Sequence, residues 1–236
     1  MHKPIKIQVN TDSVTKNKLE NRKSYNFILN NRSYNLSINT NIISTRFGVQ
    51  NIPDQILDLN GIVNIIHLIN RFIQSRQRKI PNFMIEISFP VKDLEFWNRA
   101  EIKLKLEELV GFFTDIIWKF RFILDQSKPT NPNPRLIFNL QDELELCFWS
   151  GGLDSYAGLL NRVNQFPKKK FILASFESQN LNKKIQRKLF ENIKQLYPNV
   201  EERIFIHNTL GHKNSNEYPY ARTRGLFFLI SGLSLA

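Results

Sequence analysis

One stretch of this sequence decides the fold class of its second half: Leu144-Glu145-Leu146-Cys147-Phe148-Trp149-Ser150-Gly151-Gly152-Leu153-Asp154-Ser155. Residues 144–149 are mostly apolar and predict a buried strand, and residues 155–165 predict a helix. Residues 150–155 therefore lie where a strand turns into a helix. Open backbone amides and the helix dipole favour an anion at such a junction.

The side chains of residues 150–155 suit a pyrophosphate group. Two glycines allow phosphate oxygens to approach the main chain, and Ser150 and Ser155 add hydroxyl donors. Asp154 repels a phosphate directly but can hold a Mg²⁺ ion that bridges phosphates. An ordinary strand-to-helix turn that uses glycine for its geometry is the alternative. The chain has neither Gly-x-x-x-x-Gly-Lys-Ser/Thr nor Gly-x-Gly-x-x-Gly after a strand, which weakens a γ-phosphate-cleaving ATPase and a nicotinamide dehydrogenase.

The residues that follow this loop alternate between strand and helix patterns. Strands are predicted over 144–149, 171–176 and 203–207, and helices over 155–165, 182–196 and from 221 onward. This order predicts right-handed βαβ units on a parallel sheet. The apolar run 226–230 continues to Ala236 without a polar tail. We therefore expect the chain to end in a buried helix and the sheet to be part of a longer one.

The residues before the loop predict a separate α+β module. Residues 5–9 and 25–29 alternate in polarity and predict antiparallel strands, with a hairpin at Asn30-Asn31. Helices are predicted over 53–76 and 101–113, a strand over 83–89, and an extended segment over 118–124. Residues 128–134 contain three prolines, which break regular structure. We place the domain boundary there, with an α+β domain at 1–135 and a nucleotide-binding domain at 136–236.

Composition limits the class of protein. The chain has 236 residues, of which 42% are hydrophobic and 23% charged, as in globular proteins. It contains no apolar run long enough to cross a bilayer and no secretory signal, so we expect a cytoplasmic protein without a membrane partner. Cys147 is the single cysteine, which excludes a disulfide framework and a multi-cysteine zinc site within the chain. The formal charge of +12 is spread over both halves and leaves nucleic acid open as a partner.

The motif Ser-Gly-Gly-x-Asp-Ser after a first strand resembles the signature of the PP-loop ATP pyrophosphatases. Within that superfamily the chain looks most like the 7-cyano-7-deazaguanine synthase group of queuosine biosynthesis, because of Phe176-Glu177-Ser178-Gln179 and Tyr220-Ala221-Arg222-Thr223-Arg224. The first half has further motifs: Pro90-Val91-Lys92-Asp93, Phe96-Trp97-Asn98, Phe113-Thr114-Asp115 and Trp118-Lys119-Phe120. These resemble the amino-terminal extension of synthase-like proteins in bacterial antiviral defence systems of the Qat or type IV CBASS kind.

The resemblance implies a three-layer parallel α/β domain of the adenine nucleotide α-hydrolase type, here incomplete. It also implies that ATP is cleaved to AMP and pyrophosphate while a carboxylate, such as 7-carboxy-7-deazaguanine, is activated for attack by ammonia or by an amine on a partner protein of the defence system. ATP and Mg²⁺ are the implied cofactors. Carried onto this sequence, the implied nucleotide contacts are Ser150, Gly151, Gly152, Leu153, Ser155, the main chain from Ala174 to Phe176, and Arg224.

Two of these residues have the central roles in the implied chemistry. Asp154 would hold Mg²⁺ through the phosphates, and Arg224 would clamp a phosphate with its planar fork of donors. The chain departs from the synthase pattern at Glu177-Ser178-Gln179, where Tyr-Gly-Gln is usual, and at Gly225, where Asn is common. The zinc-binding cysteines of the synthase would lie beyond Ala236, so no zinc site is predicted.

Other functions remain open on the sequence. A different PP-loop enzyme, such as a tRNA-modifying one, is an alternative, although a thiolase would want more cysteines than Cys147. A truncated, inactive ATP-binding or assembly subunit is another, and a nucleic-acid-binding module is a third. We interpret Cys147 as an inert buried thiol, His207 and His212 as surface histidines, and Trp97 and Trp118 as core residues.

Overall fold

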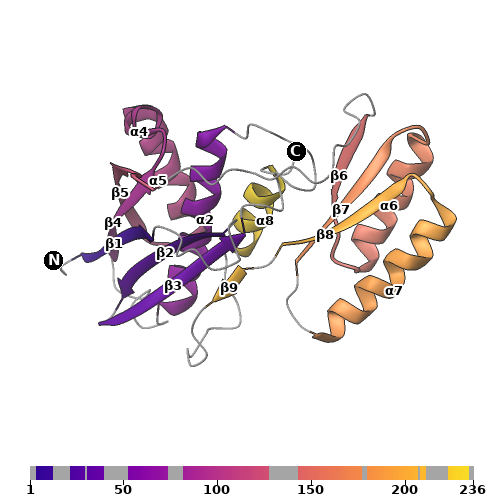
Figure 1. The fold of residues 1–236 in the computed structure, drawn as a ribbon, viewed down its shortest axis with the longest axis horizontal. Coiled ribbons are helices and arrows are strands. Elements are labelled where there is room, and N and C mark those ends of the chain that lie inside the picture. Colours follow the sequence, from indigo (N-terminus) through magenta and orange to yellow (C-terminus); the bar gives the residue numbers. More distant parts are fainter. Residues whose placement is uncertain are drawn as a thin grey trace.

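The computed structural model describes residues 4–12, 22–29, 31–39, 53–73, 82–127, 143–176, 180–206, 208–210 and 223–233. In these residues the chain has a mixed α/β fold with two β-sheets (Figure 1). The first half of the chain supplies most of a six-stranded sheet, and the second half forms a three-stranded parallel sheet. None of the helices described combines the length and apolar character that crossing a membrane requires.

The six-stranded sheet contains β1 (Ile5–Asp12), β2 (Arg22–Leu29), β3 (Arg32–Asn39), β4 (Met84–Val91), β5 (Ile117–Leu124) and β9 (Asn208–Leu210). Its strand order is β5-β4-β1-β2-β3-β9. β2 pairs antiparallel with both β1 and β3, which confirms the predicted antiparallel strands and hairpin. Asn31 has φ 59° in that hairpin, a conformation that asparagine tolerates. β4 runs parallel to its neighbours β1 and β5.

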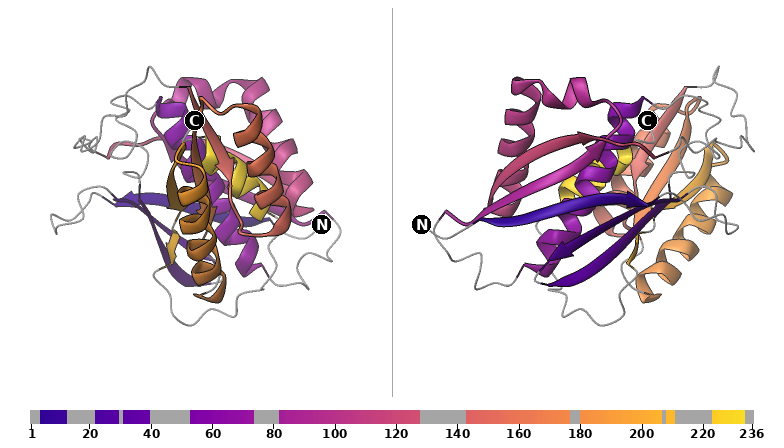
Figure 2. Two further views of the ribbon diagram at one scale, coloured as in Figure 1. Left: turned by 90° about the vertical axis from the view of Figure 1, so that its right-hand side faces the viewer. Right: turned by 60° about the vertical axis from the view of Figure 1, so that its left-hand side comes forward.

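Helices cover one face of this sheet. The predicted helix over 53–76 is α2 (Asp54–Phe72), which starts directly after Pro53 and ends where Ile73 becomes extended. α5 (Ala100–Thr114) confirms the helix predicted over 101–113, and a short helix, α4 (Leu94–Asn98), precedes it. In the right-hand view of Figure 2, α2 and α8 lie behind the strands of the large sheet. Alternate strand residues and one side of α2 form the core between these layers: Ile7, Val9, Phe27, Ile85, Ile87, Trp118, Phe120, Ile62, Ile65, Ile66 and Ile69.

The three-stranded sheet has the order β6-β7-β8, with all strands parallel, as predicted. Its strands are β6 (Leu144–Phe148), β7 (Lys170–Phe176) and β8 (Val200–Ile206), and its helices are α6 (Leu153–Gln165) and α7 (Asn180–Leu196). α6 begins two residues before the predicted start at Ser155. A second core joins sheet and helices: Trp149, Leu159, Val163, Phe171, Leu173, Ile193 and Val200.

The last described helix, α8 (Arg224–Leu233), packs on α2 of the first module. Thr223, which is fully buried, anchors its start: its hydroxyl lies 2.9 Å from His67 Nδ1 and accepts from Asn70 Nδ2 at 3.2 Å. The ring of Phe227 stacks on His67 with centroids 5.0 Å apart. α8 also reaches the three-stranded sheet, because Phe228 packs edge-on against Phe148 at the end of β6. α8 therefore contacts both modules (Figure 1).

The predicted division of the chain at residues 135 and 136 falls in 128–142, which lie outside the described residues. β9 and α8, which follow that division in sequence, join the sheet and the core of the first module. The division into two domains stays a prediction. What the structure adds is that the end of the described chain returns to the first module.

Candidate functional site

The loop of residues 149–152 connects β6 to α6, and the Ser-Gly-Gly-x-Asp-Ser motif spans this loop and the first turn of α6. Gly152 is the N-cap residue of α6, and no side chain caps the helix there. The first N–H groups of a helix have no partner within the helix, so an uncapped N-terminus presents donors to a ligand. Ser150, Gly152 and Asp154 are exposed, and Leu153 is 81% exposed. The site therefore faces solvent with its donors accessible.

The two motif serines lie together. Ser150 Oγ and Ser155 Oγ are 3.0 Å apart, and Ser150 Oγ also accepts from the Gly152 N–H at 3.1 Å. Ser155 Oγ donates to the Gly152 carbonyl at 2.9 Å. Two hydroxyls and a backbone N–H thus converge on one small region at the start of α6. The two hydroxyls can turn to a phosphate oxygen with little rearrangement, since hydroxyl hydrogens rotate freely.

Gly151 has φ +74°, the left-handed region that glycine adopts without strain. Gln186 of α7 packs directly against it: a Cβ built on Gly151 would lie 2.8 Å from Gln186 Cγ. Gln186 Nε2 also donates to the Ser150 carbonyl at 2.7 Å. The loop conformation is therefore held from α7 as well as by its own chain neighbours.

The groups present fit a phosphate-bearing ligand with a bound Mg²⁺. The exposed hydroxyls and helix N–H groups are anion donors, and Asp154 in the first turn of α6 supplies an oxygen ligand of the kind that Mg²⁺ prefers. Among the residues that the structure describes, no three His, Cys, Asp or Glu side chains gather as a metal site. Mg²⁺ is commonly held by one or two carboxylates together with substrate phosphates.

The predicted adenine contacts adjoin this loop. Phe148 pairs with Ala174 in the parallel register, and the Trp149 N–H donates to the Ala174 carbonyl at 2.7 Å. β7 ends at Phe176, so its carboxyl end lies beside the loop at the same edge of the sheet. The Ala174 carbonyl already accepts a sheet hydrogen bond, and its methyl group is buried. The side chain of Phe176 is outside the described part of the chain.

Arg224 is the first residue of α8, and its side chain is not among those described. Arg222, His207, His212 and Glu177-Ser178-Gln179 also lie outside the described residues. The fixed point near Arg224 is Thr223, which the first module holds through His67 and Asn70. The predicted role of Arg224 in clamping a phosphate stays a prediction.

The structure also shows the surroundings of three other residues named in the sequence: Cys147, Trp97 and Trp118. Burial raises the pKa of the Cys147 thiol to about 11, and the nearby Glu145 carboxylate adds to the rise. A thiol with such a pKa is protonated near neutrality and is a poor nucleophile.

Trp97 and Trp118 are buried in the core of the first module, as predicted. Their indole nitrogens donate to Asp58 Oδ2 at 3.1 Å and to Thr114 Oγ1 at 2.8 Å.

No sequence pattern predicted a role in the site for the side chains of Gln186, Trp149 or Ser175. Each has a buried polar atom without a hydrogen-bond partner in the described structure, namely Gln186 Oε1, Trp149 Nε1 and Ser175 Oγ. Trp149 precedes the motif directly, and Ser175 follows Ala174 at the end of β7. Unpaired buried polar atoms are rare in folded proteins. No sequence pattern distinguished Gln186, because it is one polar residue in an amphipathic helix.

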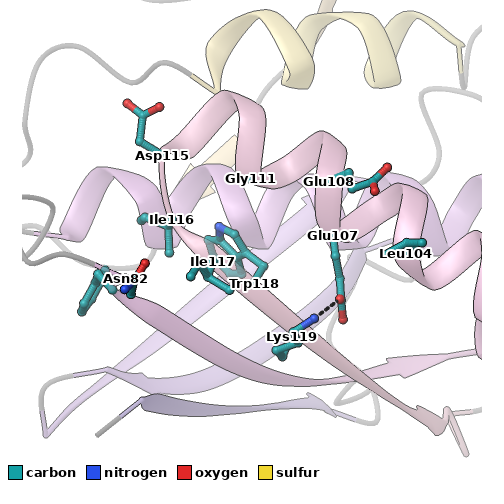
Figure 3. Close-up of a pocket in the computed structure, with 11 residues that line it drawn as sticks. Asn82, Leu104, Glu107, Glu108, Gly111, Asp115, Ile116, Ile117, Trp118 and Lys119 are labelled. Atoms are coloured by element: carbon teal, nitrogen blue, oxygen red, sulfur yellow. Dashed lines mark hydrogen bonds and ion pairs between the residues drawn. The ribbon is translucent and has the colours of Figure 1, made fainter. Parts of the chain in front are cut away.

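A hollow lies in the first module, between α5 and β5 (Figure 3). It has a volume of about 460 Å³, and Leu104, Glu107, Asp115 and Lys119 are among its lining residues. Glu107 is bound to Lys119 Nζ at 2.6 Å and accepts from the Phe120 N–H at 3.1 Å. β5 is an edge strand, so Glu107 covers part of an open sheet edge. These contacts are structural, and the loop at α6 remains the candidate site.

Comparisons of the chain with protein-family models, with curated proteins and with solved structures gave no match.

Proposed function

We propose that the chain is an ATP-dependent adenylating enzyme that binds the pyrophosphate end of ATP in the loop before α6. The observation that supports this most is the uncapped N-terminus of α6, with the hydroxyls of Ser150 and Ser155 3.0 Å apart beside it. Helix N–H groups and hydroxyls at one point form a binding site for anionic oxygens. The resemblance of residues 150–155 to the PP-loop motif supports ATP as the source of those oxygens.

In the proposed mechanism the protein positions the reactants and stabilises charge. Ser150, Ser155 and the helix N–H groups would hold the β- and γ-phosphates, and Asp154 would hold Mg²⁺, which neutralises phosphate charge when bound. Arg224 would clamp a phosphate oxygen. Positioning and charge stabilisation suffice for transfer at phosphorus, so no nucleophilic side chain is required. The raised pKa of Cys147 agrees with a mechanism that does not use its thiol.

The proposed substrate is a carboxylic acid of the 7-carboxy-7-deazaguanine type. A carboxylate oxygen attacks the α-phosphorus of ATP, the bond to the bridging oxygen breaks, and pyrophosphate leaves. Ammonia or a protein amine then attacks the acyl carbon, an amide bond forms, AMP leaves with the electron pair of the broken bond, and the nitrogen loses a proton to solvent. Resemblance to the synthase group and to defence-system proteins supports this substrate class, and it also supports the adenine nucleotide α-hydrolase type of fold for the three-stranded sheet.

Release of AMP and pyrophosphate from Mg·ATP, with 7-carboxy-7-deazaguanine present, tests the proposal. We expect wild-type protein to form both products, and Asp154→Ala to lose at least about 90% of the rate, because charge neutralisation at phosphate contributes several kcal/mol to such steps. Glu95→Ala is the matched control, since it removes an exposed carboxylate from the first turn of α4 in the other module. ATP binding without AMP formation would favour the alternative of a nucleotide-binding subunit. If ATP does not bind, the proposal is wrong.

A further inference from the structure

Gln186 connects α7 to the loop by a buried hydrogen bond. Gln186 is only 4% exposed, although its neighbours in α7, Ile185 and Arg187, are exposed. Nε2 donates to the Ser150 carbonyl at 2.7 Å. A carbonyl oxygen cannot donate, so the amide group must present its nitrogen to Ser150. Oε1 is left buried without a partner in the described structure.

This hydrogen bond determines which way one peptide group of the loop points. The carbonyl of Ser150 and the N–H of Gly151 belong to the same peptide unit, and none of the described peptide bonds is cis. In a planar trans peptide the two groups point in opposite directions. Because Gln186 holds the carbonyl towards α7, the Gly151 N–H points away from α7. That is the side on which an anion would meet it.

Close packing reinforces the same orientation. Gly151 has φ +74°, and there is no room for a Cβ between it and Gln186 Cγ. A leucine or methionine would fill the space at position 186 without leaving a buried amide oxygen unpaired. Gln186 therefore offers a donor that an apolar residue lacks, at the cost of an unsatisfied acceptor. Packing alone therefore does not explain a glutamine at position 186.

We propose that Gln186 is a positioning residue that sets the loop of residues 149–152 in its anion-binding conformation. This inference rests on the proposed function, because it assigns Gln186 a role in binding pyrophosphate. Gln186 acts through the Ser150–Gly151 peptide and does not touch the ligand. Its loss weakens binding of the phosphate end of ATP and leaves the fold intact.

Titration calorimetry with Mg²⁺ and inorganic pyrophosphate is the primary test. Gln186→Leu removes the donor and keeps a similar volume, and we expect its dissociation constant to rise about tenfold, the effect of one lost hydrogen bond. Gln195→Leu is the matched control, because it is the same substitution on the same helix at an exposed position. Urea denaturation of both variants identifies any general loss of stability.

Gln186→Glu adds a readout that a purely structural role would not move. An ionised carboxylate cannot donate to the Ser150 carbonyl, whereas a protonated carboxyl group can. We expect pyrophosphate affinity, relative to wild type at the same pH, to be weakest where the introduced carboxyl group is ionised and to recover as the pH falls and that group takes up a proton. A ratio that does not change with pH would contradict the proposed role of the donor.

Hydrogen exchange of the segment 149–153 without ligand separates this inference from the proposed function. Gln186→Leu should speed exchange of the Gly152 amide, whose N–H donates to Ser150 Oγ, while Gln195→Leu should not. If wild-type protein fails to bind pyrophosphate, the proposed function is wrong, and the exchange rates still show whether Gln186 holds the loop. Unchanged exchange and unchanged affinity in Gln186→Leu would overturn the inference.

Discussion

The indole nitrogen of Trp97 donates to the carboxylate of Asp58 at 3.1 Å, and both residues are buried. The same carboxylate accepts from the N–H groups of Lys92 at 2.9 and 3.0 Å and of Asp93 at 3.1 Å. Asp93 in turn caps α4 by accepting from the Phe96 N–H at 2.9 Å. A single carboxylate of α2 thus fixes the turn after β4 and the start of α4. These contacts give a structural reason for the motif residues 90–98.

Asp58→Asn should destabilise the first module by about 2–3 kcal/mol, because hydrogen bonds to a charged acceptor are worth about 1.5–3 kcal/mol. The NH2 group of the introduced amide would also face N–H groups that now donate to the carboxylate. Trp97→Phe removes only the indole donor and should cost about 1–2 kcal/mol. Urea unfolding measures both changes. Asp154→Asn, at an exposed position, should change the unfolding free energy by less than about 0.5 kcal/mol. Equal stability of Asp58→Asn and wild type would show that the buried network contributes nothing.

Local patterns predicted most elements because each depends on few residues. The period of 3.6 in α2 and the alternation in β1 and β2 are visible without tertiary information. The parallel pairing of β1 with β4 joins Ile5 to Ile85, a contact that no local pattern encodes. β9 has three residues and takes its conformation from pairing with β3. The docking of α8 on α2 depends on Thr223 meeting His67, residues that are 156 positions apart.

The candidate site likewise has one part that the local sequence predicts and one part that depends on tertiary packing. The glycines and serines of residues 150–155 stand next to each other in sequence, so their chemistry could be inferred from the motif. Gln186 lies 36 residues from Ser150 and meets it only because α7 packs beside the loop. Its amide has no feature that separates it from the other polar residues of α7. Contacts of this kind become visible only when the helices are placed.

Gly151→Ala should prevent pyrophosphate binding and reduce stability by about 1–2 kcal/mol, because a Cβ is strained at φ +74° and would also meet Gln186 Cγ. Gly158→Ala is the control within α6: a Cβ there meets nothing within 4 Å, and alanine should stabilise the helix by about 0.5–1 kcal/mol. Calorimetric titration measures the pyrophosphate affinity, and urea unfolding measures the change in stability. Tight pyrophosphate binding by Gly151→Ala would show that the left-handed turn is dispensable.

The ion pair between Glu145 and Arg162 predicts a pH-dependent stability. Arg162 Nε and Nη2 donate to the two Glu145 oxygens at 2.6 and 2.7 Å, which ties α6 to β6 on either side of the loop. The hydrogen bond from Arg162 lowers the pKa of Glu145 below its ordinary value of 4.5. Its contribution is therefore present above about pH 4.5 and is lost as the pH falls below that value through the lowered pKa.

Glu145→Gln should accordingly cost about 1 kcal/mol at pH 7, a value that allows for the partial exposure of Arg162. The difference from wild type should shrink as the pH falls below 4.5. Urea midpoints measured between pH 3 and pH 7 test this trend. Arg187→Gln, which breaks an exposed pair with Glu191, should cost less than about 0.5 kcal/mol at any of these pH values. A Glu145→Gln difference that grows at low pH would have the wrong sign.

Cys147 should react slowly while the protein is folded. Its pKa rises from 9.0 to about 11, so at pH 8 the thiolate fraction is roughly a hundredfold lower than in the unfolded chain. The raised pKa also means that stability from the neutral thiol is present below pH 9 and is lost as the pH rises towards 11. Alkylation by iodoacetamide, followed by mass spectrometry in buffer and in urea, measures the ratio. Equal rates in the two solutions would contradict a partly buried thiol with a raised pKa.

Gly232 tests whether α8 rests on the end of β6. A Cβ at this position would lie 2.6 Å from Cε1 of the Phe148 ring, so Gly232→Ala should cost about 1–3 kcal/mol through overpacking. Gly225→Ala is the matched control on the same helix, because a Cβ there meets nothing within 4 Å, and it should be neutral or stabilising by up to about 1 kcal/mol. Phe148→Leu combined with Gly232→Ala should recover part of the loss, since the smaller side chain makes room. Independent, additive effects of the two substitutions in urea unfolding would mean that the residues do not touch.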